Sequence, residues 1–300
     1  MIVTDWRDAD PALVRSCYDR EAQHWRRNLG WDTEQTWSTV EEARVTWGLP
    51  GLLAVDGSRV DGWTFYTRDG DVLQLGGLVS ESGEATAQLL REVLKAAEHA
   101  ALPTVSCFVL ERAEDLRTEL TRQGFEVEPF LYLATALSHD GSLSKDPLVS
   151  GTRTSWVDGD VETAGELLCA SYSLRAARYF APHGTAAEWQ QYVTTMVEQT
   201  ACGVFDPFIT QVVRDKRGMR ALAFITRIGP RTAHLAQFAV HPEERSRGLA
   251  SRLLQDTMQI AASAGCDEMT LLVGETNQPA RRLYERRGFA ARATFVAARR

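Results

Sequence analysis

The chain of 300 residues repeats one pattern twice, and this repeat constrains its fold more than any other feature. A Trp-x-Asp-x-Asp spacing begins at Trp6 and again at Trp156, each time before an apolar run of helical period. An Arg-x-Gly-Phe sequence ends at Phe125 and again at Phe289. Because these matches occur in the same order, the sequence predicts two tandem copies of one domain.

The two copies are separated by residues 139–151, a stretch rich in turn-forming residues that we interpret as a linker. We therefore expect one domain at residues 1–138 and a second at residues 152–300. Each copy alternates strand-like and helical segments. This pattern predicts an α/β fold in which each domain is a mixed, mostly antiparallel and twisted sheet flanked by helices.

The second copy divides clearly into elements. Asp160 is the expected N-cap of its first helix. The expected strands lie at residues 152–156, 208–214, 220–227, 232–240, 268–273 and 291–297, and the expected helices at 160–171, 186–198, 248–264 and 279–287.

Composition narrows the classes of function. The formal net charge of −7 argues against a nucleic-acid or anionic-membrane partner. No signal peptide or membrane-spanning run is visible, so we expect a cytoplasmic protein. The five cysteines are scattered and form no Cys-x-x-Cys pair, which favours free thiols over a metal site. Either a monomer or a homodimer agrees with these features.

The strongest chemical signal is the loop between strand 232–240 and helix 248–264. This loop contains Arg245, Arg247 and Gly248. Backbone N–H groups at a helix N-terminus bind anions, and glycine lets a ligand approach the backbone closely. The pattern predicts a pyrophosphate site. It is neither a Walker loop nor a Gly-x-Gly-x-x-Gly dinucleotide loop.

Two blocks of the second copy resemble the GNAT superfamily of N-acetyltransferases. The sequence Arg245-x-x-Gly248-x-Ala250 is similar to the acyl-CoA loop of that family. The segment from Asn277 to Phe289 is similar to the family's closing helix. The resemblance covers residues 151–300 well and the first copy only distantly. It implies a GNAT fold in both copies and acetyl-CoA as the acyl donor.

The resemblance also implies which residues hold acetyl-CoA. Backbone groups of the loop and the first helical turn would bind the pyrophosphate, and the end of the preceding strand would polarise the thioester carbonyl. Asn277 would contact the pantetheine arm. The residues of this set are Phe238, Ala239, Val240, Arg245, Arg247, Gly248, Leu249, Ala250, Ser251 and Asn277.

Two residues are candidates for catalysis. By resemblance, Tyr284 would protonate the leaving thiolate, although it could also be an ordinary packing residue. His234 has the side chain type that can remove a proton from an amine near neutral pH, or it is a locally satisfied strand histidine. Strand alternation predicts that His234 shares a face with Phe238 and Val240, and that Gln237 lies on the opposite face.

The first copy lacks this chemistry. Aligned with the second copy, it has Glu81 in place of Arg245, Glu84 in place of Gly248 and Leu120 in place of Tyr284. Both acidic replacements oppose anion binding, so we expect a degenerate GNAT-like domain.

The sequence gives only a weak indication of where the acceptor amine binds. Aromatic residues between the first two helices of the second copy predict either an apolar pocket for an amine or a helix-packing core. They are Tyr172, Tyr179, Phe180, His183, Trp189 and Tyr192.

The sequence predicts an acetyl-CoA-dependent N-acetyltransferase that acts on the primary amine of a small molecule by direct attack, without a metal. Three alternatives stay open. One is a non-catalytic acyl-CoA-binding regulator. Another is acetylation of a cysteinyl sugar, by resemblance to the two-copy mycothiol synthase family. The third is a protein-lysine acetyltransferase.

Overall fold

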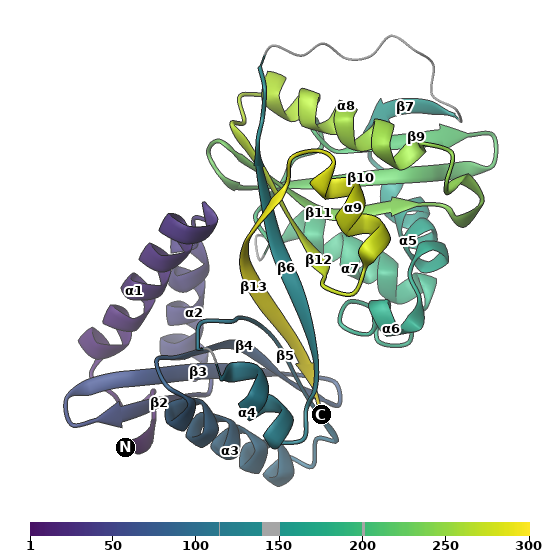
Figure 1. The fold of residues 1–300 in the computed structure, drawn as a ribbon. Coiled ribbons are helices and arrows are strands. Elements are labelled where there is room, and N and C mark those ends of the chain that lie inside the picture. The colour runs from purple at the N-terminus through teal and green to yellow at the C-terminus, as the bar shows by residue number, and fades with distance from the viewer. Residues whose placement is uncertain (114, 140–150, 200–201) are drawn as a thin grey trace. The chain divides into compact units, whose positions relative to one another are not determined.

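The computed structural model describes residues 1–113, 115–139, 151–199 and 202–300 (Figure 1). The chain forms two compact units that are not continuous in sequence. Unit 1 comprises Met1–Tyr132, Val273–Asn277 and Ala291–Arg300, and unit 2 comprises Leu133–Leu272 and Gln278–Ala290. The expected linker lies almost wholly outside the described residues. The expected boundaries at 138 and 152 stay a prediction.

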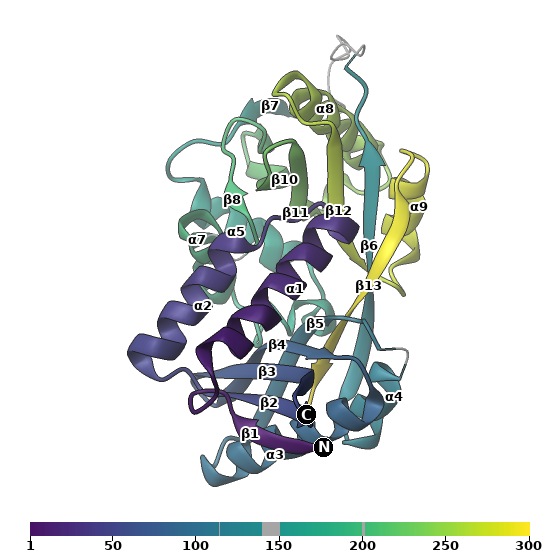
Figure 2. The ribbon, with the colours of Figure 1, turned by 90° about the vertical axis from the view of Figure 1, so that its left-hand side faces the viewer.

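Unit 1 is a sheet with the strand order β1-β2-β3-β4-β5-β13 (Figure 2). Its neighbouring strands pair antiparallel, except β4 and β5, which are parallel. The strands are β1 (Ile2–Asp5), β2 (Gly51–Asp56), β3 (Arg59–Asp69), β4 (Val72–Ser80), β5 (Thr104–Leu110) and β13 (Ala290–Arg299), and the helices are α1 (Pro11–Leu29), α2 (Glu34–Trp47), α3 (Gly83–His99) and α4 (Leu116–Arg122).

Two apolar clusters hold unit 1 together. Helices α1 and α2 pack on β2 and β3 through an aromatic cluster that includes Trp6, Trp37 and Trp63. Helices α3 and α4 pack on the sheet through an aliphatic cluster that includes Leu89 and Leu120. Helices therefore cover both faces of the sheet, as the alternating pattern predicted.

The last strand, β13, belongs to unit 1 although the repeat places it in the second copy. Val296 pairs with Val109 of β5. Val296 and Ala298 are fully buried in the same aliphatic cluster as α3. A strand near residues 291–297 was expected and is confirmed. Its partner was not expected, because apolar periodicity identifies a strand but not the neighbour it pairs with.

Unit 2 contains the strand order β12-β11-β10-β9-β7, with β8 paired to β10. The unit boundary falls within β6 (Glu126–Ala136) and within β12 (Glu268–Gly274). The other elements are β7 (Thr152–Ser155), α5 (Asp160–Ser171), α6 (Leu174–Ala177), α7 (Ala186–Glu198), β8 (Val204–Phe205), β9 (Gln211–Asp215), β10 (Gly218–Gly229), β11 (Thr232–Val240), the 3-10 turn η1 (Pro242–Glu244), α8 (Leu249–Ser263) and α9 (Gln278–Glu285).

The helices of unit 2 begin where local chemistry favours it. Thr185 and Glu188 form a reciprocal capping box at the start of α7. The expected N-cap of α5 was wrong by one residue, because Gly159 caps the helix. The Asp160 carboxylate instead accepts the N–H of Val157 and forms an ion pair with Arg214.

Helices pack on the sheet of unit 2 as well. Helices α5 and α7 bury Leu168 and Trp189 in one cluster with Phe224 of β10. Helix α8 contacts β10 and β11 and buries its own stripe of Leu249, Leu253 and Leu254. The mixed, mostly antiparallel sheet flanked by helices is therefore confirmed.

Both units carry the same irregularity in corresponding strands. In β11, Leu235 pairs with Ile225 and Gln237 pairs with Phe224, so Ala236 is an extra residue that forms a β-bulge. In β4, Gly76 is the extra residue in the same way. This shared bulge supports the internal repeat, since bulges are specific features of a strand pairing.

Both units also contain a parallel strand pair that parts early. Pairing of β11 with β12 covers Thr232–Leu235, and pairing of β4 with β5 covers Val72–Leu75. Each first strand continues beyond its last pair, to Val240 in β11 and to Ser80 in β4. The parted end of β11 leads directly into the loop that the sequence singled out.

Candidate functional site

The loop between β11 and α8 has the backbone geometry of an anion cradle. Gly248 is the N-cap of α8 with φ +83°, and Ser246 also adopts a positive φ of +61°. Helix α8 has no side-chain cap and no acidic residue in its first turn. A Cβ added to Gly248 would meet nothing within 4 Å. These residues fit a pyrophosphate, since the helix dipole and open N–H groups attract anions.

The two loop arginines have different roles in the described structure. The Arg245 guanidinium donates to the Ser171 carbonyl at 2.7 Å and to the Val240 carbonyl at 3.4 Å, so it ties the loop to the ends of α5 and β11. The Arg247 side chain is 60% exposed and forms an ion pair with Glu244 at 3.3 Å. Both arginines are exposed, and Arg247 is the one whose guanidinium is not engaged with the ends of α5 and β11.

The corresponding junction of unit 1 is already satisfied by protein oxygens. The Ser82 hydroxyl caps α3 by accepting the N–H of Ala85, and Glu84 lies in the first turn. A Cβ added to Gly83 would collide with the Asp115 carboxylate. Ser82, and not Glu84 as the alignment suggested, precedes α3. The expectation of a site unsuited to anions stays a prediction that these contacts support.

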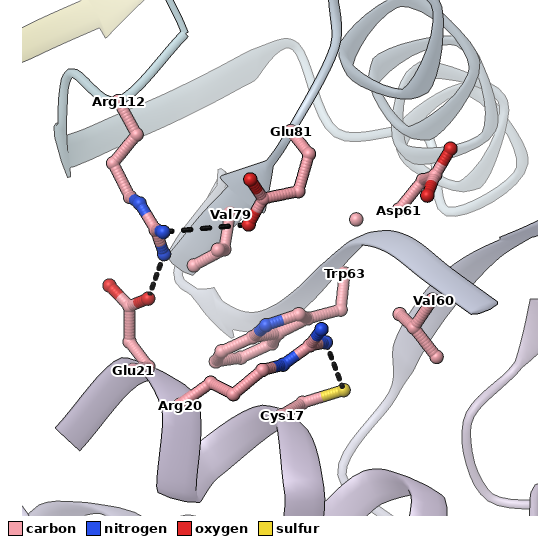
Figure 3. Close-up of a pocket in the computed structure, with 10 residues that line it drawn as sticks. Cys17, Arg20, Glu21, Val60, Asp61, Trp63, Val79, Glu81 and Arg112 are labelled. Carbon is pink, nitrogen blue, oxygen red and sulfur yellow. Dashed lines mark hydrogen bonds and ion pairs between the residues drawn. The ribbon is translucent and has the colours of Figure 1, made fainter. Parts of the chain in front are cut away.

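A small cleft in unit 1 lies beside this junction (Figure 3). The Arg112 guanidinium points between two carboxylates, Glu21 at 2.5 Å and Glu81 at 3.4 Å. None of the residues predicted to bind acetyl-CoA lines this cleft. Its lining residues are Cys17, Arg20, Glu21, Val60, Asp61, Gly62, Trp63, Val79, Glu81 and Arg112.

The remaining residues predicted to bind acetyl-CoA cluster around the cradle, with one exception. Phe238, Ala239 and Val240 form the end of β11 beyond its pairing with β12, and Leu249, Ala250 and Ser251 form the first turn of α8. Arg287 donates to the Ser251 hydroxyl at 2.8 Å. Asn277 belongs to unit 1, where its N–H donates to the Gly274 carbonyl at 2.9 Å.

Tyr284 lies on α9 and is only 6% exposed. Its ring contacts those of Phe238 and Phe289, with centroid distances of 6.4 and 5.7 Å. Burial, and to a lesser degree the neighbouring Tyr172, raise the pKa of the Tyr284 hydroxyl above its usual value. The phenol therefore keeps its proton at neutral pH, as a general acid requires.

His234 lies on β11 and is 4% exposed. Its Nδ1 atom is 2.9 Å from the Thr270 hydroxyl. Burial lowers the pKa of His234 to about 4, so the imidazole is neutral at pH 7. A neutral imidazole can accept a hydrogen bond from an amine. Its low pKa makes it a poor acceptor of a full proton from an ammonium ion.

The expected alternation along β11 is wrong, because the bulge at Ala236 reverses it. His234 pairs with Thr226 and Gln237 pairs with Phe224, and these two partners share one face of β10. His234 and Gln237 thus lie on the same face, whereas Phe238 lies on the other. No residue type in β11 indicates the bulge. The alternation of side chains along the sequence therefore could not predict it.

The aromatic residues of the expected acceptor region separate into two groups. Trp189 is fully buried in the helix-packing cluster, whereas Tyr172, Phe180 and Tyr192 pack on its edge and are partly exposed. His183 is exposed and bonds to Glu188. Gln237, for which the sequence predicted no role, bonds through its amide to the hydroxyls of Tyr172 and Tyr192.

The described ranges contain neither a candidate metal cluster nor a candidate membrane span. No group of three or more His, Cys, Asp or Glu side chains is placed to hold a metal ion there. No helix in the same ranges is both long and apolar enough to span a bilayer.

The comparisons agree with the geometry. Residues 172–289 match the acetyltransferase (GNAT) family model. A GCN5-related N-acetyltransferase from Sphaerobacter thermophilus has a similar fold, with a TM-score of 0.71 at 16% identity over 99% of this chain and 95% of that one. A tandem GNAT protein from the clavulanic acid biosynthesis pathway gives a TM-score of 0.55 at 16% identity, over 84% and 82% of the two chains.

Residues 172–289 are thus similar to the GNAT acetyltransferases, a family whose members use an acyl-CoA donor. The chain as a whole is similar in fold to a tandem GNAT protein. Its sequence relatives are distant mycothiol acetyltransferases. The one from Clavibacter michiganensis is 34% identical over 96 residues, which cover 32% of this chain and 31% of that relative. The match therefore spans about a third of the relative's length.

Proposed function

We propose that this chain is an acetyl-CoA-dependent N-acetyltransferase that acts on the primary amine of a small molecule, with its working site in unit 2. The observation that carries the proposal is the contrast between the two strand–loop–helix junctions. The N-terminus of α8 is open to an anion, whereas that of α3 is capped by Ser82. Only the junction in unit 2 is suited to a pyrophosphate.

The donor would be held by the cradle and the parted end of β11. Acetyl-CoA supplies an activated acyl group whose thioester carbonyl is the electrophile. Backbone N–H groups near Phe238 to Val240 would donate to the carbonyl oxygen, since β11 has left its pairing with β12 there. Charge from Arg247 would add to the cradle.

The amine would then attack the carbonyl carbon directly, and the C–S bond would break. Tyr284 would give its proton to the leaving sulfur. His234 would accept a hydrogen bond from the attacking amine, which enters as the free base because the imidazole is too weakly basic to deprotonate an ammonium ion. The proton lost from nitrogen would pass to solvent, and Tyr284 would regain a proton from solvent.

The cysteines support attack without an acyl-enzyme. All five are free thiols. Burial raises the pKa of Cys202 to about 11 and that of Cys107 to about 12, and it also raises the pKa values of Cys17 and Cys266. A nucleophilic cysteine needs the opposite shift, since the thiolate is the reactive form. Free thiols also agree with a reducing, cytoplasmic location.

Two substitutions at the ends of α8 test donor binding. Gly248→Glu should abolish acetyl-CoA binding in calorimetry, because it places bulk and negative charge in the cradle. Gly265→Glu is the matched control. Gly265 follows the same helix with φ +85° and equally open space, so it carries similar backbone strain without touching the cradle. Equal affinity in both variants would contradict the proposal.

A thiol-release assay separates an enzyme from a regulator. The chain should release CoA from acetyl-CoA in the presence of the right amine. The panel should include cysteinyl sugars, because distant relatives of this chain are named mycothiol acetyltransferases. Binding of acetyl-CoA without thiol release for any amine would favour the regulator.

A further inference from the structure

We infer that the Gln237 amide, together with the hydroxyls of Tyr172 and Tyr192, is the acceptor-recognition site, and that it selects a primary amine carried on an uncharged body with hydroxyl or amide groups. This inference rests on the proposed N-acetyltransferase function and adds a substrate class to it.

The placement of these three side chains depends on the bulge in β11. Ala236 is the extra residue, so Gln237 turns toward the face covered by α5 and α7. Tyr172 follows the last residue of α5, and Tyr192 lies in the middle of α7. Three elements far apart in sequence thus bring their polar atoms to one point, on the same face as His234.

The hydrogen bonds fix the amide and leave part of its capacity unused. The Tyr172 hydroxyl donates to Gln237 Oε1 at 2.8 Å, and Gln237 Nε2 donates to the Tyr192 hydroxyl at 2.9 Å. Within the described residues the amide makes no other side-chain hydrogen bond. One N–H and one lone pair of the amide therefore remain, and the Tyr192 hydroxyl keeps its own proton for donation.

The amide is buried but its partners reach the surface. Gln237 is 6% exposed, whereas Tyr172 and Tyr192 are partly exposed. A buried polar group with unused bonding capacity is costly unless a ligand or water completes it. A ligand that enters past the two tyrosines would meet this capacity at their hydroxyl ends.

The surroundings of the network are electrically neutral. Phe180 and Trp189 contact the tyrosine rings at centroid distances of 5.0 to 5.6 Å. Within the described ranges, none of the side-chain hydrogen bonds or ring contacts of Gln237, Tyr172 and Tyr192 is with a carboxylate or a guanidinium. Burial raises the pKa of Tyr172 to about 12 and keeps His234 neutral, so no charge develops here at pH 7.

An uncharged lining around Gln237, Tyr172 and Tyr192 would select against amines that carry a second charged group. A second ammonium group, as in a polyamine, would lose its hydration here without gaining a carboxylate partner. A carboxylate, as in an amino acid, would lack the cation that usually pairs with it. Hydroxyl and amide groups suit the unused donors and acceptor, and aromatic edges suit an apolar or ring-shaped body.

Matched amines test the selectivity directly. Thiol release from acetyl-CoA by the full chain is measured with 5-amino-1-pentanol against 1,5-diaminopentane, and with tyramine against tyrosine. Each pair differs by one charged group. The uncharged member should show kcat/KM at least about 10-fold higher, which corresponds to one unpaired buried polar group. Equal or better use of the charged members would overturn the inference.

Variants test the residues. With the better amine, Tyr192→Phe and Gln237→Leu should raise the acceptor KM about 3- to 10-fold, as expected for a lost hydrogen bond. The acetyl-CoA KM and kcat should change less than about 2-fold, which a general structural defect would not allow. Tyr179→Phe is the control, because the Tyr179 hydroxyl bonds to Arg178 and not to Gln237.

The outcomes separate this inference from the proposed function. Wild-type transfer combined with unchanged acceptor KM values in both variants overturns this inference alone. Acetyl-CoA binding without transfer to any of the amines overturns both. Raised acceptor KM values in Tyr192→Phe and Gln237→Leu, with Tyr179→Phe unchanged, support the site.

Discussion

The ring of Tyr284 lies beside the ring of Phe238, with centroids 6.4 Å apart and planes inclined by 56°. This contact fixes α9 against the segment of β11 that has left its pairing with β12. The phenol is thereby held next to the backbone that would polarise the thioester carbonyl. The same strand turns Gln237 toward the opposite face, so β11 separates the two groups to which we assign the leaving thiol and the acceptor.

Tyr284→Phe should lower kcat about 10²- to 10⁴-fold, the range for a lost general acid. Acetyl-CoA affinity should stay nearly unchanged, because the contacts with Phe238 and Phe289 involve the ring and not the hydroxyl. Steady-state kinetics and calorimetry measure the two quantities.

Tyr179→Phe also controls this experiment, since it removes a tyrosine hydroxyl from the same unit. If Tyr284→Phe retains full kcat, and single-turnover rates are equally unchanged, Tyr284 is a packing residue. The single-turnover measurement is needed because slow product release can mask a slower chemical step.

The buried His234 should make the stability of the protein depend on pH. Its pKa is lowered from 6.5 to about 4 by burial, so the unfolded chain binds a proton at a higher pH than the folded chain does. Stability is therefore complete above pH 6.5 and is lost as the pH falls toward 4. Between pH 7 and pH 5 this residue should account for a loss of about 2 kcal/mol in the free energy of unfolding.

Denaturant unfolding of wild type and His234→Gln at both pH values measures this loss, which the variant should lack. The same variant tests the base hypothesis. A limb in the kcat/KM profile near pH 6.5 that is present in wild type and absent in His234→Gln would show that the histidine titrates near its usual pKa, contrary to its burial.

Sequence patterns located the elements of unit 2 well where local signals are strong. The expected spans of α5, α7 and β11 coincide with those observed, because turn residues and caps mark their ends. The four-residue α6 and the two-residue β8 were not expected, since so few residues show no period. The pairing of β13 with β5 depends on contacts between distant parts of the chain, which periodicity does not encode.

The site was predictable to the same degree. The loop from Arg245 to Gly248 could be predicted because the residue types that bind an anion lie within four consecutive positions. The role of Gln237 could not, since it depends on one extra residue in β11 that reverses the alternation. The burial that weakens His234 as a base was hidden for a related reason, because it involves neighbours far away in sequence, such as Thr270 of β12.

The last strand should stabilise unit 1 and not unit 2. Val296 is fully buried against residues of β5 and α3, so Val296→Ala should cost about 2–3 kcal/mol through lost apolar contacts and a small cavity. Tryptophan fluorescence during unfolding reports mainly on unit 1, because Trp6, Trp25, Trp31, Trp37, Trp47 and Trp63 all lie there.

Val157→Ala is the matched control for Val296→Ala. Val157 is 55% exposed in unit 2, and its truncation should change stability by less than about 0.5 kcal/mol. An unfolding midpoint that is the same in Val296→Ala and wild type would show that β13 does not contribute to the core of unit 1.

The full chain should bind one acetyl-CoA, in unit 2. At the junction of unit 1, the Ser82 hydroxyl already accepts a backbone N–H of α3, and the carboxylates of Glu84 and Asp115 lie at the same helix end. An incoming pyrophosphate would have to displace the cap and approach two negative charges.

Calorimetry on the intact chain should give a stoichiometry of about one, and Gly248→Glu should remove all detectable binding. The intact chain is required, because residues 1–138 alone lack the strand that completes the sheet of unit 1. A stoichiometry near two, or a site of unchanged affinity that survives in Gly248→Glu, would show that unit 1 binds the donor despite its capped helix.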